Sequence, residues 1–167
     1  EILVVADKEA NPAYVAADLL SQAEHDPMAS AILVSDSEEL IQKVNQELAI
    51  QVEKLPKVEI AKASLKAYGT SILCDSIDQC IEISNQIAPE HLELMIQEPM
   101  SYLDQVKHAG SVFLGYYTCE SIGDYFGGTN HVLPTNGTAR FSSALGVDSF
   151  IKKSSFLYYS EAAIKAY

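Results

Sequence analysis

Short apolar runs alternate with amphipathic helical segments from Ile2 to Leu114, and this alternation limits the chain to one class of fold. Short runs of this kind are typical of strands that are buried on both faces. Five of them predict strands, at residues 2–5, 31–34, 71–74, 92–96 and 111–114. Helices are predicted from Pro12 (capped by Asn11) to about His25, from Ser37 to about Glu53, after Pro56 to before Gly69, from the cap Asp75 to Ile87, and from Pro99 to about His108. This order indicates a mainly parallel sheet.

The predicted fold class is therefore α/β: a three-layer, incomplete Rossmann-like sheet of about five mainly parallel strands, with helices on both faces. The 167 residues suit a single core. We expect residues 1–145 to form this α/β domain and residues 146–167 to form a C-terminal helical extension of two short segments. Residues 115–140 show no periodicity and contain several glycines. A stretch of that length inside a compact domain usually has a function.

The charge of the chain excludes some classes of partner. The formal net charge is -12, with 11 Lys and Arg against 23 Asp and Glu. Because a protein that neutralises phosphates needs a basic face, we expect no nucleic acid and no anionic membrane as partner. No apolar run approaches the length of a membrane span. The three cysteines form no Cys-x-x-Cys pair, which favours a reducing, cytoplasmic compartment. The chain begins at Glu1, directly before a strand, so we expect it to be part of a longer protein.

An acid and a base stand side by side at Glu90 and His91, where the fourth helix meets the fourth strand. Pro89 ends the helix and disfavours a helical conformation at Ala88, which places the pair at a junction. A glutamate can activate water or carry a proton, and the unperturbed pKa of histidine lies nearest neutral pH. One such pair is most often an ordinary surface feature, so its interpretation depends on the rest of the chain.

Other polar candidates lie in two places. Gln22 and His25 are three residues apart near a predicted helix end, so they share one helix face and could grip one ion. An isolated pair of this kind is usually solvated. Asp124 and His131 lie in the glycine-rich stretch, where glycines let the backbone bring side chains close to a ligand.

The predicted topology does not bring these groups together by itself. Ligands of open parallel sheets bind outside the carboxyl ends of the strands, where the glycine-rich stretch begins. His91 enters its strand at the opposite edge. The two would meet if the fourth strand ran antiparallel, or if Glu90 and His91 belonged to a loop that curls over the sheet. The Gly127-Gly128 step lacks the phosphate-binding patterns, which disfavours a nucleotide there.

Four segments, taken together, resemble the signature blocks of one family, histidinol dehydrogenase. They are LSQAEHDP (20–27), IAPEHLEL (87–94), GDY (123–125) and TNHVLPT (129–135), and GTARFSS (137–143) extends the match. The order and spacing of the blocks fit, and the resemblance covers essentially the whole chain.

The resemblance implies an enzyme that oxidises L-histidinol through the aldehyde to L-histidine with two NAD, as the last step of histidine biosynthesis. It implies zinc ligands at Gln22, His25 and Asp124. It implies that His91 is the general base and that Glu90 activates the attacking water. The substrate would contact Gln22, His25, His91, Asp124 and His131. The zinc would mainly position the substrate, which is one of the established roles of a catalytic metal.

The same resemblance implies that parts of the enzyme lie outside this chain. NAD would be bound by earlier sequence, and a partner subunit of a homodimer would supply a further zinc-ligand histidine and a substrate glutamate. The chain alone is therefore expected to be inactive. Two alternatives stay open. One is a zinc hydrolase with Glu90 as base and His25 and Asp124 on the metal, and the other is a non-catalytic interaction module that keeps the fold.

Overall fold

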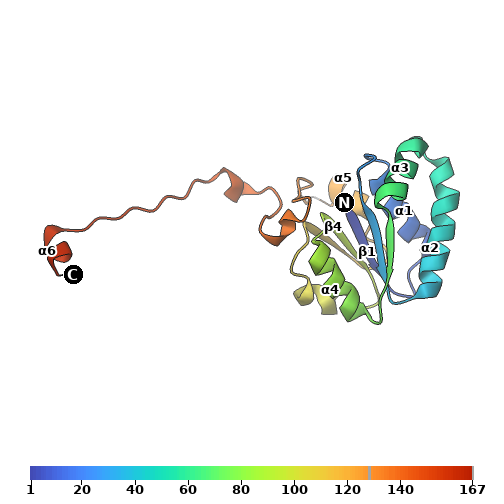
Figure 1. Cartoon of the computed structure of the whole chain (residues 1–167), viewed down its shortest axis with the longest axis horizontal. Coiled ribbons are helices and arrows are strands. Elements are labelled where there is room, and N and C mark those ends of the chain that lie inside the picture. The colour runs from blue at the N-terminus through green and yellow to red at the C-terminus, as the bar shows by residue number, and fades with distance from the viewer. Residues whose placement is uncertain (128, 167) are drawn as a thin grey trace.

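The computed structural model describes residues 1–127 and 129–166 (Figure 1). Gly128 of the Gly127-Gly128 step and Tyr167 of the expected extension lie outside the described residues. Five strands form one sheet in the order β3-β2-β1-β4-β5, and every pair is parallel. The strands are β1 (Ile2–Ala6), β2 (Ala31–Ser35), β3 (Thr70–Leu73), β4 (His91–Met95) and β5 (Ser111–Leu114). The predicted α/β sheet is confirmed, and the alternative of an antiparallel fourth strand is wrong.

Helices cover both faces of the sheet (Figure 1). One face carries α1 (Pro12–Ala23), α2 (Glu38–Gln51) and α3 (Val58–Tyr68), and the other carries α4 (Ile77–Ile87) and the 3-10 segment η2 (Pro99–Gln105). The remaining helical segments are η1 (Val52–Lys54), α5 (Glu120–Tyr125), η3 (Thr138–Arg140), η4 (Val147–Phe150) and α6 (Glu161–Lys165). The predicted helix from Pro99 is thus a shorter 3-10 segment, and α5 was not predicted.

Local capping explains where the helices begin and end. The Asn11 side chain accepts the N–H of Ala13 at 2.9 Å and opens α1, as predicted. The cap of α4 is Ser76 rather than the predicted Asp75, because the Ser76 hydroxyl accepts a backbone N–H of the first turn. Ala88 ends α4 in the left-handed region, at φ 56°. The chain therefore turns sharply before β4.

The sheet alternates its side chains between the two helical layers, as strands must. In β1, Ile2 and Val4 pack into the core formed with α1, α2 and α3, whereas Leu3 packs into the core under α4. Ile2 pairs with His91 on β4. Val4 pairs with Glu93. His91 and Glu93 therefore face the α1 layer, although β4 is buried along its whole length.

The C-terminal segment that carries η4 and α6 leads away from the α/β body as an extended arm (Figure 1). Two short helical segments lie there with extended chain between them, as the sequence predicted. Its assignment as a unit separate from residues 1–145 stays a prediction. Within the described ranges, no helix is both long enough and apolar enough to span a bilayer.

Candidate active site

His91 is the first residue of β4 and its side chain is almost wholly buried, with 4% of the residue exposed. Its Nδ1 lies 3.0 Å from the carbonyl oxygen of Glu1. Because a carbonyl only accepts hydrogen bonds, Nδ1 carries the proton and Nε2 presents a lone pair. This Nε2 is buried and has no hydrogen-bond partner among the described residues. An unsatisfied buried polar atom costs about 1–3 kcal/mol, which indicates a position built for a ligand or substrate.

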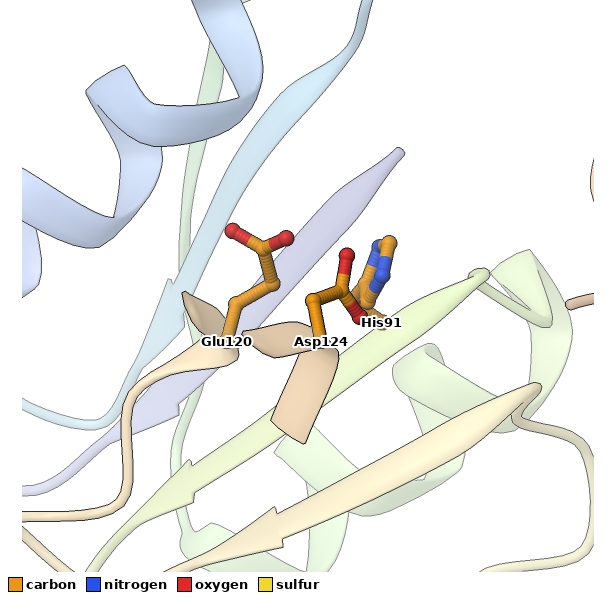
Figure 2. Close-up of side chains that lie close together, drawn as sticks. All are labelled: His91, Glu120 and Asp124. Carbon is orange, nitrogen blue, oxygen red and sulfur yellow. The ribbon is translucent and has the colours of Figure 1, made fainter. Parts of the chain in front are cut away.

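Two carboxylates reach the same point from α5 (Figure 2). Ligand atoms of His91, Glu120 and Asp124 all lie within 4.8 Å of one another. Glu120 is buried and Asp124 is half-buried. One imidazole and two carboxylates are donors that a divalent cation of intermediate softness accepts. The arrangement can therefore hold such a cation, or can place a base beside two acids.

The path of the chain after β5 explains how this cluster forms at the amino edge of the sheet. Gly115 follows β5 in the left-handed region, at φ 89°, and α5 then packs back across the sheet. Gly123 lies so close to Phe113 of β5 that a Cβ there would come within 2.5 Å of the ring. Since the Glu120 N–H reaches Glu93 and Asp124 reaches His91, α5 runs opposite in direction to β4. The sequence prediction of a loop carrying Glu90 and His91 over the sheet is therefore wrong, because Asp124 comes to His91 instead.

A layer of buried carboxyl groups lies next to this cluster. Glu93 is fully buried, and its Oε1 accepts the N–H of Glu120 at 3.0 Å. Burial, and then the charge of neighbouring Asp18, raise the pKa of Glu93 to about 10. Burial also raises the pKa of Asp18, to about 6, although its hydrogen bond with Glu93 acts in the opposite direction. At neutral pH the pair therefore holds one proton, which resides on Glu93.

The end of α1 adjoins α5. The Ser21 hydroxyl lies 2.9 Å from Glu120 Oε2 and 2.7 Å from the carbonyl oxygen of Asp18. The Ser21 carbonyl oxygen is 3.0 Å from His25 Nδ1, so that nitrogen donates its proton to the carbonyl. His25 is exposed and Gln22 is half-buried. Within the part of the chain that the structure describes, His25 joins no group of three possible metal ligands.

Comparison with known proteins identifies the family. A family model described as histidinol dehydrogenase matches residues 1–167. The chain belongs to the histidinol dehydrogenase family. Histidinol dehydrogenase of Clostridium acetobutylicum is 58% identical over 165 residues, covering 99% of this chain and 38% of that protein. The Halalkalibacterium halodurans protein of the same name is 56% identical over 164 residues, 98% of this chain and 39% of that protein. The chain thus spans less than two fifths of the length of these relatives.

A solved structure agrees with this assignment. The crystal structure of histidinol dehydrogenase from Elizabethkingia anophelis superposes with a TM-score of 0.89 at 47% sequence identity. The match covers 99% of this chain and 38% of that one. At this identity the likeness supports the family as well as the fold. The resemblance inferred from the four sequence blocks is confirmed.

The other predicted site residues lie at different distances from the cluster. Glu90 is half-buried, and its Oε2 is 3.8 Å from His91 Nδ1. His131 is exposed on the stretch after α5, and it is not part of the group formed by His91, Glu120 and Asp124 within the described ranges. The zinc-ligand set of the histidinol dehydrogenase resemblance stays a prediction.

Sequence reasoning missed the buried carboxyl groups Asp18, Glu93 and Glu120. Glu93 interrupts an otherwise apolar strand between Leu92 and Leu94, and Asp18 lies among the apolar residues of the buried face of α1. A charged residue at a position that the period assigns to the core is a signal that could have found both. Glu120 had no such signal, because its helix is too short to show a period.

The opposite, carboxyl edge of the sheet holds a separate crevice. Its volume is about 650 Å³, and it lies beyond the ends of β1 and β4, where open parallel sheets commonly bind ligands. Four carboxylate side chains line it, those of Asp7, Glu9, Asp36 and Glu98, against one cationic side chain, that of Lys8, so the lining is negative in net charge. Such a lining repels phosphate groups. In this histidinol dehydrogenase segment, the acid–base cluster and the crevice therefore occupy opposite edges.

Proposed function

We propose that this chain is the segment of a histidinol dehydrogenase that carries most of its metal-binding and acid–base residues. In the protein extended at both ends to the length of its relatives (the extended protein), L-histidinol is oxidised through the aldehyde to L-histidine with two NAD, as the last step of histidine biosynthesis. The observation that carries this proposal is the buried lone pair of His91 Nε2, unpartnered among the described residues and close to Asp124. Family membership over the whole chain supports it.

The proposed chemistry assigns one task to each member of the acid–base pair. His91 accepts the proton of the substrate hydroxyl at Nε2 while a hydride leaves the carbon for NAD. The Glu1 carbonyl keeps the other ring proton on Nδ1, which holds the imidazole in the accepting tautomer. Glu90 takes a proton from the water that adds to the aldehyde. The addition leaves the hydrate as its mono-anion, which then transfers a hydride to the second NAD and becomes the carboxylic acid.

Gln22, His25 and Asp124 would hold zinc, together with donors from outside these 167 residues. These residues fit a metal in their chemistry, since they offer a mixed oxygen and nitrogen shell. Ser21 fixes the ring of His25 through Nδ1, which is the usual way in which a protein orients a ligating histidine. When bound, zinc supplies a template that orients the amine and imidazole nitrogens of the substrate.

We further propose that NAD binds to residues outside this segment. The acidic lining of the carboxyl-edge crevice supports this, as does the absence of a Gly-x-Gly-x-x-Gly turn after β1. A homodimer would supply the remaining site residues, and the location would be cytoplasmic. The substrate would also contact His131.

Steady-state NADH formation with L-histidinol tests the proposal. We expect the extended protein to form two NADH per histidinol and the 167-residue chain to form none. An extended protein that contains zinc but hydrolyses esters without NAD would indicate the zinc hydrolase instead. An extended protein without zinc and without turnover would indicate the non-catalytic module. Either result rejects the assignment.

A further inference from the structure

Glu120 joins the two elements that bear the proposed metal ligands. It is the first residue of α5, 6% exposed, and it is not among the residues that the family resemblance assigns. Its N–H donates to Glu93 on the central strand β4. Its carboxylate oxygen Oε2 lies 2.9 Å from the Ser21 hydroxyl on α1, whose single proton it shares with the carbonyl oxygen of Asp18 at 2.7 Å. Glu120 therefore contacts the sheet through its backbone and the last turns of α1 through its side chain.

Each end of this contact lies next to a proposed ligand. Ser21 directly precedes Gln22, and its carbonyl oxygen accepts the Nδ1 proton of His25. Asp124 is four residues after Glu120 and therefore projects from the same face of α5. A helix of six residues has little stability of its own. The position of Asp124 consequently depends on how the first residue of α5 is anchored.

We propose that Glu120 is a positioning residue, which holds the ligand-bearing turn of α1 at a fixed distance from Asp124 through its hydrogen bond to Ser21. This inference rests on the proposed function, because it concerns the ligands assigned there. Residues that orient metal ligands from outside the coordination sphere typically contribute about 10- to 100-fold in metal affinity. Glu120 and Ser21 would act as one unit, so removing either should have nearly the same effect.

The test is metal affinity in the extended protein, measured by competition with a chelator for zinc and by the visible spectrum of the Co²⁺-substituted protein. We expect Glu120→Ala and Ser21→Ala each to weaken zinc binding about 10- to 100-fold and to change the Co²⁺ bands. Glu120→Gln keeps an oxygen acceptor for Ser21 and should restore affinity to within about threefold. The KM for histidinol should rise in the two alanine variants, because a displaced metal orients the substrate poorly.

Ser84→Ala is the matched control. The Ser84 hydroxyl likewise contacts the carbonyl oxygen three residues earlier, at 2.9 Å, but Ser84 is fully buried, whereas Ser21 is half-buried, and it lies on α4 under the opposite face of the sheet. The Ser84→Ala substitution removes a hydroxyl group, as Ser21→Ala does, but at a position that makes no contact with α5. Zinc affinity and the Co²⁺ spectrum should stay as in the wild type.

Three results separate the possible failures. Zinc loss in Glu120→Gln as large as in Glu120→Ala, with Ser21→Ala unchanged, would make Glu120 a direct ligand and overturn the positioning role. A wild type that binds zinc and oxidises histidinol, with all variants unchanged, would overturn the positioning role alone. A wild type that binds no zinc would overturn both this inference and the proposed function. If Glu120→Ala does not fold, Ser21→Ala decides the question, because it leaves α5 intact.

Discussion

Replacing Glu93 by glutamine should stabilise the fold at neutral pH and remove much of its pH dependence. Glu93 is fully buried between β4, α1 and α5, and burial is the main cause that raises its pKa from 4.5 to about 10. The folded protein therefore keeps a proton that the unfolded chain releases above about pH 4.5. A glutamine side chain has the same shape, cannot ionise, and keeps an oxygen that can accept the N–H of Glu120.

The sign and the size follow from proton linkage. Between pH 4.5 and about 10 the folded state binds one more proton than the unfolded state, so the free energy of unfolding falls as pH rises. Each pH unit corresponds to about 1.4 kcal/mol, and the interval from 4.5 to 7 gives an upper value of about 3 kcal/mol. In the Glu93→Gln variant, the free energy of unfolding should not fall with pH in this way. Its advantage should be near zero at about pH 4.5 and should grow with pH.

Urea unfolding of the purified chain at pH 5, 6, 7 and 8, followed by circular dichroism, measures this difference. Glu39→Gln is the control, because Glu39 is exposed on α2 and its hydrogen bond with Lys43 lowers its pKa. The hydrogen bond between Glu39 and Lys43 stabilises the folded state above the ordinary pKa of glutamate, and this stabilisation is lost only in acid. Curves for wild type and Glu93→Gln that run parallel from pH 5 to 8 would refute the reasoning, as would a variant that is less stable than wild type at pH 7.

Three further substitutions test contacts at the acid–base cluster and at the carboxyl-edge crevice. Gly123→Ala places a Cβ 2.5 Å from the Phe113 ring, and should lower the free energy of unfolding by about 1–3 kcal/mol in urea titrations. Tyr116→Phe removes the hydroxyl that donates to both Asp7 oxygens, at 2.9 and 3.0 Å, and should lower it by about 1 kcal/mol. His91→Gln in the extended protein should lower kcat for histidinol oxidation by about 10²- to 10⁴-fold while the zinc content, measured by atomic absorption, stays unchanged.

The sheet and most of its helices could be predicted because their signals are local. Short, mostly apolar runs mark the strands, and a cap such as Asn11 marks a helix start. These signals act within a few residues of the chain. The parallel direction also followed, because helices alternate with strands throughout residues 1–114.

The site could be predicted only in part, because α5 depends on tertiary contacts. Its six residues have no period, and its first N–H is satisfied by Glu93, which lies 27 residues earlier. No pattern around Glu120 indicates that contact. The family blocks supplied Asp124 and His91 as site residues without saying how they would meet. The missing step was the return of the chain across the sheet after Gly115.

Because the chain returns across the sheet after Gly115, the site forms only if β4 pairs with β1 in the observed register. His91 and Glu93 face α1 and α5, whereas Leu92 and Leu94 fill the core under α4. A shift of one residue against β1 would exchange the two sets. The imidazole would then be buried against apolar side chains, and a leucine would stand opposite Asp124. Because β4 is paired on both sides, with β1 and β5, neither neighbour permits such a shift alone. The central position of β4 in the sheet therefore maintains the placement of His91 beside α5.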